Sequence, residues 1–204
     1  MNWTDIQQWE SAPLQAYAVN CEHKQRKLQT VGDTLGQRLD SLLGSSQTVK
    51  AAKAALREQI FAIEKEVNFL ISSAEIASEG AQGINEIRAN ADDAKQMAHS
   101  WRLTIDSSGN VSMDAAVLKA HLNLGHHWIE IEAMVGRTQQ RVNSALEQAR
   151  SLVESLSQKM SALDAGTYDN NVHYSATHKI RPSLPPAGAS AQEVASWWSS
   201  LSDD

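Results

Sequence analysis

The sequence predicts an all-α protein, an elongated antiparallel bundle of three long helices with a small hairpin-like corner near residues 102–113 and an extended C-terminal arm. Two features of the composition favour this fold class. Ala, Leu, Gln and Glu are abundant, and only 5% of the 204 residues are aromatic although 42% are hydrophobic; unbranched and small side chains lose little rotamer freedom in helices. The third observation is periodicity, since apolar residues recur at steps of three and four along much of the chain.

The first predicted helix covers roughly residues 12–43. Most of its apolar residues are three or four positions apart and therefore share one face. This stripe consists of Leu14, Tyr17, Ala18, Cys21, Leu28, Val31, Leu35, Leu39 and Leu42. Cys21 is the only cysteine, so no internal disulfide can form. Its place on the stripe favours a small buried hydrophobic side chain over a nucleophile or a metal ligand.

The second predicted helix follows Gly44, which we interpret as a helix C-cap, and continues to about residue 101. Its apolar stripe lasts about seven heptads, with small residues toward the end where a partner helix can approach closely. The stripe consists of Val49, Ala52, Leu56, Ile60, Ile63, Val67, Leu70, Ala74, Ala77, Ala81, Ile84, Ala91, Ala94, Ala98 and Trp101. A charge run is interpreted as the solvated face of this helix, namely Glu64, Glu66, Glu75, Glu79 and Glu86.

The third predicted helix covers about residues 115–164, after a tight corner. In this corner, Thr104-Ile105 and Val111 are β-prone residues on either side of a turn cluster. The helix has its apolar stripe in its second half, at Val142, Leu146, Ala149, Leu152, Val153, Leu156, Met160 and Leu163. The second helix would be about 80 Å long and the first about 48 Å. We therefore expect the second helix to be a spine that the first and third helices cover in succession.

The character of the sequence changes after the predicted helical domain, residues 1–165. Residues 166–189 contain three of the four prolines and are predicted to form a linker or an arm lying on the bundle. Residues 190–204 are predicted to form a short helix that begins with a capping box of Ser190 and Glu193. Trp197 and Trp198 in this helix need a surface to pack on. We therefore expect a further domain beyond Asp204.

Charge and hydropathy exclude several classes of function. The formal net charge is −6 and the basic residues are scattered, whereas nucleic-acid binding requires basic residues gathered on one face. No apolar run approaches the roughly 20 residues that span a bilayer. The first ten residues lack the basic and apolar regions of a cleavable signal peptide. We expect neither nucleic-acid binding nor a membrane span, and any export requires another route.

One cluster resembles a metal site. His126 and Glu130 are four residues apart, with His121 and His127 nearby, and on a helix they could share a zinc ion. The alternative is a solvated face or a helix corner, because histidine is commonly part-exposed without a ligand role. His173 and His178 in the arm have no spaced partner of ligand type. We predict no metal-binding, cofactor-binding or catalytic residue, since nucleophile elbows, phosphate loops and convergent carboxylate pairs are also absent.

Three segments resemble a known family. Leu42-Leu43-Gly44 is similar to the turn of the W-x-G helical hairpin proteins exported by type VII secretion systems, with Leu in place of Trp. Residues 94–111, AKQMAHSWRLTIDSSGNV, resemble the end of the hairpin domain in actinobacterial exported proteins. The tail, from Pro185-Pro186-Ala187-Gly188-Ala189-Ser190 to the Trp197-Trp198 segment, resembles a connector to a C-terminal α/β-hydrolase or toxin domain.

This resemblance implies a non-catalytic export and targeting domain at the N-terminus of a type VII secretion effector. Its partners would be small helical W-x-G-type proteins and the secretion machinery, and its location would be the cytoplasm before export and then the cell surface or exterior. The family's Y-x-x-x-D/E signal is absent, because Val172 follows Tyr168 and His178 follows Tyr174 at the fourth position. Either a partner carries the signal or the chain is not exported this way. The residues predicted to serve interaction or packing are Leu42, Gly44, Leu56, Ile60, Ile63, Val67, Leu70, Trp197 and Trp198.

Two other interpretations remain open. The chain could be the helical platform or lid of an α/β-hydrolase whose catalytic domain lies beyond residue 204, and a downstream G-x-S-x-G segment followed by Asp and His would support this. It could instead be a structural rod or an oligomeric coiled coil, which the length of the second helix favours. The predicted third helix argues against a rod, because it already supplies a partner for the spine.

Overall fold

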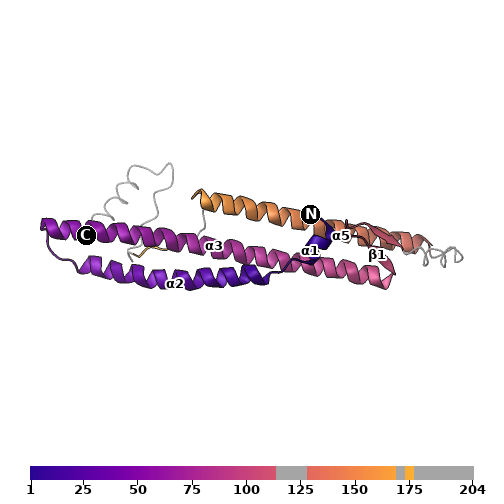
Figure 1. Cartoon of the computed structure of the whole chain (residues 1–204), viewed down its shortest axis with the longest axis horizontal. Coiled ribbons are helices and arrows are strands. Elements are labelled where there is room, and N and C mark those ends of the chain that lie inside the picture. The colour runs from indigo at the N-terminus through magenta and orange to yellow at the C-terminus, as the bar shows by residue number, and fades with distance from the viewer. Residues whose placement is uncertain (114–127, 169–172, 177–204) are drawn as a thin grey trace, which may run out of the picture. The chain divides into compact units, whose positions relative to one another are not determined.

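The computed structural model describes residues 1–113, 128–168 and 173–176 of the chain. These residues form α1 (Trp3–Gln7), α2 (Ala12–Ser41), α3 (Gln47–Ser100), β1 (Leu103–Ile105), β2 (Val111–Met113) and α5 (Trp128–Asp164) (Figure 1). The prediction of an all-α bundle is confirmed. The first two predicted helices match α2 and α3 to within about two residues, and α5 matches the described part of the third. Residues 115–127 of that helix, most of 166–189 and all of 190–204 lie outside the described residues.

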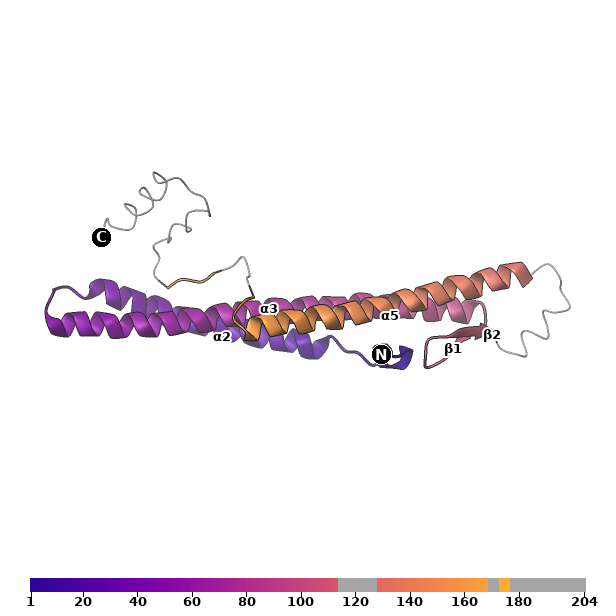
Figure 2. The same cartoon turned by 90° about the horizontal axis from the view of Figure 1, so that it is seen from above.

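The chain divides into two compact units. Unit 1 comprises residues 1–25 and 69–172, and unit 2 comprises residues 26–68 and 173–204. Helices α2 and α3 are each divided between the units, α2 after residue 25 and α3 after residue 68. In unit 1, α5 lies alongside the second half of α3, as both views show (Figures 1 and 2). In unit 2, the second half of α2 lies alongside the first half of α3.

Helices α3 and α5 of unit 1 run antiparallel. Asn90 of α3 bonds to Gln148 of α5, while Glu79 pairs with Lys159, so residue numbers rise on one helix as they fall on the other. The hydrophobic core between them is made mainly of small and branched side chains. It consists of Trp3, Ile6, Ile87, Ala91, Ala94, Val142, Ala145, Leu146 and Ala149.

Small residues on α3 allow the neighbouring helices to approach closely. A Cβ atom added at Gly83 would lie 2.7 Å from Leu152 Cδ1, so the leucine occupies the space that a side chain would need. One turn away, Gly80 receives Leu14 from α2 and Leu156 from α5 in the same way. The predicted close approach along the C-terminal half of the long helix is therefore confirmed, because α2 and α5 both contribute leucines to it.

Helix α1 was not predicted, although its start carries a recognisable signal. Asn2 Oδ1 accepts a hydrogen bond from the Asp5 backbone N–H (2.9 Å), and the Asn2 N–H donates to Asp5 Oδ2 (2.8 Å). This capping box satisfies two backbone donors that a helix start leaves without partners. The short helix buries Trp3 and Ile6, which are 2% and 0% exposed. An Asn followed three residues later by Asp is the pattern that marks it in the sequence.

The predicted corner is a β-hairpin, in which β1 and β2 pair antiparallel from Leu103 opposite Met113 to Ile105 opposite Val111. Asp106 organises its turn, because its Oδ1 accepts the N–H groups of Ser108 (2.8 Å) and Asn110 (2.9 Å). The hydrogen bonds from Asn110 are the main reason that the pKa of Asp106 lies below its ordinary value. From α5, Gln139 Nε2 donates to the Gly109 carbonyl (2.8 Å) and so ties the hairpin to the bundle.

Two members of the predicted stripe on the first helix are exposed. Tyr17 is 47% exposed and Val31 is 48% exposed, so the neighbouring helices bury only part of each side chain. Cys21 is buried as predicted. Gly44 has a left-handed backbone with φ of 104°, but it follows the last helical residue, Ser41, by three positions. It therefore shapes the connection to α3 instead of acting as the C-cap.

None of the helices that the structure describes is both long enough and apolar enough to span a bilayer.

The core of unit 1 allows a matched test of burial. Ile87 is 3% exposed in α3 and Ile129 is 77% exposed in α5, so replacing each by Ala removes the same atoms from opposite environments. We expect Ile87→Ala to lower the free energy of unfolding by about 2–5 kcal/mol, because it leaves a cavity. Ile129→Ala should change it by no more than about 0.5 kcal/mol. Urea denaturation measures both values, and equal losses would contradict this core.

Candidate functional site

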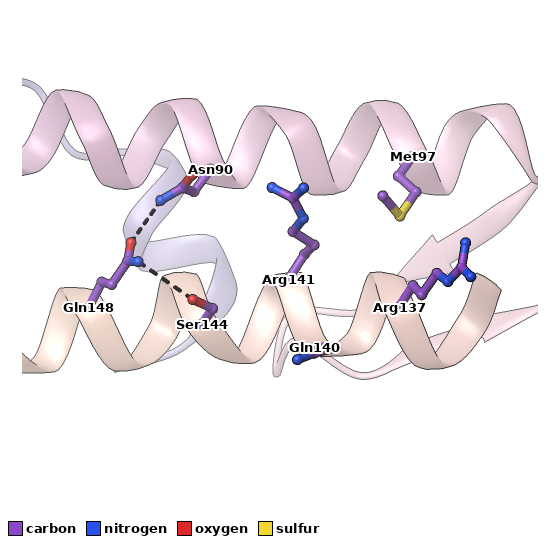
Figure 3. Close-up of a pocket in the computed structure, with 7 residues that line it drawn as sticks. All are labelled: Asn90, Met97, Arg137, Gln140, Arg141, Ser144 and Gln148. Carbon is purple, nitrogen blue, oxygen red and sulfur yellow. Dashed lines mark hydrogen bonds between the residues drawn. The ribbon is translucent and has the colours of Figure 1, made fainter. Parts of the chain in front are cut away.

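A polar groove lies between α3 and α5 of unit 1, with a volume of about 640 Å³. Asn90 Nδ2 donates a hydrogen bond to Gln148 Oε1 (2.8 Å), and Gln148 Nε2 donates one to Ser144 Oγ (3.5 Å) (Figure 3). Arg141 lies 3.7 Å from a carboxylate oxygen of Asp93. The lining residues are Asn90, Met97, Arg137, Gln140, Arg141, Ser144 and Gln148. No imidazole or carboxylate among them could activate the serine, so this groove offers hydrogen bonding and positive charge.

The predicted metal cluster falls mostly on residues that the structure does not describe. His121, His126, His127 and His178 lie outside the described residues. Glu130 is exposed in the first turn of α5. Within the described ranges, no group of three or more His, Cys, Asp or Glu side chains is placed to hold a metal ion. That these histidines and Glu130 bind no metal ion therefore stays a prediction from the sequence.

The most elaborate polar arrangement in unit 2 surrounds residues 173–176, which we call the strap. The strap is drawn in orange beside α2 and α3 in Figure 1. It contacts what we call the seam, the line along which residues 26–41 of α2 meet residues 47–68 of α3. Every strap residue beyond His173 is at least half-buried, and Ala176 is only 5% exposed. The predicted linker thus contains a short segment that packs on the helices of its own unit.

Asn68 of α3 pairs with the strap backbone through both ends of its side-chain amide. The Tyr174 N–H donates to Asn68 Oδ1 (2.7 Å), and Asn68 Nδ2 donates to the Tyr174 carbonyl (3.3 Å). One turn earlier, Glu64 Oε1 accepts hydrogen bonds from the Ala176 N–H (2.8 Å) and the Ser175 hydroxyl (3.0 Å). An amide side chain supplies a donor and an acceptor together, so Asn68 acts on the strap as a neighbouring β-strand would.

The prediction that the charge run forms a solvated face is wrong at Glu64. The run predicts a solvated face at five glutamates, but Glu64 is half-buried and accepts two hydrogen bonds from the strap. The other four are exposed, and Glu79 among them also pairs with Lys159. The charge run identified the polar side of the helix correctly for most positions. It could not reveal that a segment more than 100 residues later would cover Glu64.

Two glycines of α2 provide the space that the strap occupies. A Cβ atom added at Gly32 would lie 2.5 Å from the Tyr174 hydroxyl, and one added at Gly36 would lie 2.7 Å from the Ala176 carbonyl oxygen. Both distances are far below van der Waals contact. Glycine inside a helix costs about 0.5–1 kcal/mol relative to alanine. The close contact with the strap gives a physical reason for tolerating this cost twice in one helix.

Tyr174 anchors the strap in the seam. Its hydroxyl lies 2.9 Å from Asp33 Oδ1 and 3.0 Å from the Gln29 carbonyl oxygen, so its single O–H hydrogen lies between two acceptors one helical turn apart. Burial raises the pKa of the Tyr174 phenol well above its ordinary value of 10.0, and the hydrogen bond to Asp33 and the charges of Asp33 and Glu64 raise it further. The strap therefore holds this phenol in its neutral form.

The residues that hold the strap were not predicted from the sequence. Tyr174 drew attention only as part of a possible export signal, and Asn68 and Asp33 belong to no recognised motif. A signal was nevertheless present in the glycine pair Gly32 and Gly36, because two glycines four residues apart on an apolar stripe indicate a close approach to that face. Such a pair does not identify what approaches.

The predicted interaction residues have different environments. Ile60, Val67 and Leu70 are buried, with Val67 0% exposed. Leu42, Leu56 and Ile63 are half-buried along the seam, and Gly44 is exposed in the connection between the helices. Trp197 and Trp198 lie outside the described residues. The structure thus places seven of these residues in the α2/α3 hairpin and its continuation in α3, while their role in binding a partner stays a prediction.

The seam is open toward the turn of the hairpin. From residue 37 to residue 59 no side chain is buried. Four large apolar residues of this stretch, Leu39, Leu42, Val49 and Leu56, are each only half-buried, and Leu43 is exposed. Two helices alone cannot enclose the stripe between them, because each covers only one side of it. Among the described residues, this is the largest part of an apolar stripe that no third element covers.

Comparison with known protein families, with curated proteins and with solved structures finds no match to this chain.

The raised pKa of Tyr174 predicts an alkaline transition in the strap. The folded state favours the neutral phenol of Tyr174. The contribution of this phenol to the free energy of unfolding is therefore fully present below pH 10, the pKa of an unfolded tyrosine, and is lost as the pH rises through the raised pKa. We expect Asp33→Asn to lower the pKa of Tyr174, because the mutation removes the charged acceptor. Absorbance titration of tyrosinate, with Tyr174→Phe to identify the signal, measures this pKa. Asp40→Asn removes an exposed charge from the same helix, and an equal effect of both variants would contradict the assignment.

Proposed function

We propose that this chain is a non-catalytic partner-binding and targeting module of a type VII secretion substrate, and that the open seam of its α2/α3 hairpin binds a small helical W-x-G-type partner. The observation that carries this proposal is the half-buried apolar stripe between residues 37 and 59, which no third element covers within the part of the chain that the structure describes. Exposed apolar stripes of this kind mark sites where another protein packs.

The rest of α3 indicates what kind of element fits the seam. In unit 1 the stripe of α3 is covered by α5, and alanines such as Ala77, Ala91 and Ala94 are 5% exposed or less. At Gly80, Leu14 of α2 and Leu156 of α5 both contact α3, so a third helix covers the stripe there. A partner that supplies an amphipathic helix, or a helical hairpin, would complete the seam in unit 2 in the same way.

The turn of the hairpin supports the same proposal. Leu42-Leu43-Gly44 resembles the W-x-G turn, and Gly44 has the positive φ of 104° that favours glycine over residues with a Cβ atom. Leu43 is 86% exposed at this turn. An apolar residue so fully exposed beside a half-buried stripe extends the surface that a helical partner would cover.

The test requires substitutions that spare the hairpin itself. Changing Ile60 or Val67 to Asp would place a charge among buried side chains, at 4% and 0% exposure, and would disrupt folding as well as binding. Leu42 and Leu56 are half-buried and line the open stretch. Their substitution by Asp acts mainly on a partner that buries them.

We expect the double variant Leu42→Asp, Leu56→Asp to weaken binding of a W-x-G-type protein from the same organism at least about tenfold, because the partner would have to bury unpaired charges. Isothermal titration calorimetry with the purified chains measures this affinity. The control is Ile129→Asp, which places the same charge on an exposed apolar side chain of unit 1 and should leave the affinity unchanged. Equal binding by the double variant, or no binding by the unmodified chain to any such protein, would show the proposal to be wrong.

A further inference from the structure

We propose that the seam at Gly32–Gly36 is a receptor for an extended Tyr-Ser-Ala peptide, which residues 174–176 occupy in cis, so that the strap is an exchangeable latch tying the C-terminal arm to the α2/α3 hairpin. This inference does not depend on the secretion proposal. It rests on the contacts of the strap with unit 2.

The spacing of the contacts matches an extended peptide to a helix. Asn68 and Glu64 are four residues apart on α3, which corresponds to a rise of about 6 Å. The backbone N–H groups that they accept belong to Tyr174 and Ala176, two residues apart, and two residues of extended chain cover about 6.6 Å. Alternate amides of the strap therefore face α3, and the repeat of the peptide agrees with one turn of the helix.

The same spacing recurs on α2. Gly32 and Gly36 are also four residues apart, and they lie against Tyr174 and Ala176 respectively. The strap thus runs in the same direction as α2 and opposite to α3. Two helices present contacts at the same interval on both sides of the seam, which defines a groove for one extended segment in one register.

The groove distinguishes side chains at three successive positions. Tyr174 reaches acceptors on Gln29 and Asp33, and Ser175 donates to Glu64. Ala176 is only 5% exposed, and its Cβ atom lies 3.3 Å from the position that a Cβ would take at Gly32, so a larger side chain would have to displace its neighbours. Backbone hydrogen bonds give such a groove affinity, and the pockets for side chains give it specificity.

The occupant is the chain's own segment because the contacts are formed within unit 2. A tethered segment competes at an effective concentration in the millimolar range when its linker is short. A free peptide would therefore displace the strap only where the strap is weakened. The test of exchange therefore weakens the strap before a free peptide is added.

The first test uses hydrogen–deuterium exchange of the full chain. The amides of Tyr174 and Ala176 should exchange at least about tenfold more slowly than those of an unstructured peptide. Gly36→Ala should abolish this protection, because the new Cβ atom collides with the strap backbone. Gly136→Ala is the matched control, since Gly136 lies inside α5 with nothing within 4 Å of an added Cβ atom, and it should leave the protection unchanged.

A second pair of variants tests the polar contacts without altering the helix packing. Glu64→Ala removes the acceptor for Ser175 and Ala176 and should increase exchange at Ala176. Glu64→Gln keeps a carbonyl oxygen at that place and should restore most of the protection. If Gly36→Ala and Glu64→Ala both exchange like the unmodified chain, the strap is not held by this groove and the proposal is wrong.

The third test asks whether the groove recognises the peptide in trans. A fluorescent peptide of residues 171–178 should bind saturably to the full chain carrying Tyr174→Ala, whose own strap is weakened. Adding Gly36→Ala to that chain, or replacing Tyr by Phe in the peptide, should weaken binding severalfold. Equal binding of the peptide to both chains would show that the groove does not recognise it.

The oligomeric state tests whether the strap binds in cis. If the unmodified chain sediments as a dimer and Gly36→Ala converts it to a monomer, the strap comes from a second copy and the proposal of occupancy in cis is wrong.

Discussion

The structure depends on one packing constraint, namely that two antiparallel helices cannot bury the apolar stripe that runs between them. Each stretch of α3 therefore needs a third element beside its neighbour. In unit 1, α2 and α5 both contact α3 at Gly80, and Trp3 and Ile6 of α1 complete the core that α3 and α5 form around Ala91 and Ala94. In unit 2 a strap of four residues covers the seam at Gly32 and Gly36, and the stretch from residue 37 to 59 has no described cover. The proposed partner site follows from this last stretch.

Residues without large side chains decide where the third element can approach. Gly83 of α3 receives Leu152, and Gly32 of α2 receives Tyr174 in the same geometric manner. In both cases a side chain from a distant part of the sequence fills the volume that a Cβ atom would occupy. The dispersion attraction between these closely packed atoms offsets the lower helix propensity of glycine. The same device thus serves helix packing in unit 1 and recognition of an extended segment in unit 2.

The strap and the open stretch suggest different kinds of recognition on one hairpin. The strap is held by directional hydrogen bonds that its backbone N–H groups donate to Asn68 and Glu64, which define its register. The open stretch offers leucine and valine side chains, which favour burial without defining a register so strictly. A module with both surfaces could hold its own C-terminal arm while a helical partner occupies the neighbouring part of the seam.

Much of the fold could be predicted from local pattern. The lengths of α2 and α3, the β-hairpin at residues 103–113 and the burial of Cys21 follow from periodicity, turn residues and composition, which act over a few neighbouring positions. Helix α1 also carried a local signal, the Asn2 and Asp5 capping box, although no helix was predicted there. These elements depend on backbone propensity and on the spacing of apolar residues, and both are visible in the chain itself.

The sequence by itself thus determined the fold class, the three long helical segments and the positions that face inward along most of them. Only the tertiary structure decided that Tyr17 and Val31 stay exposed and that Glu64 binds the strap. It also decided that Gly32 and Gly36 make room for Tyr174 and Ala176. The physical reason is that these features depend on contacts between segments up to 145 residues apart, and periodicity shows which face of a helix is apolar but not what covers it.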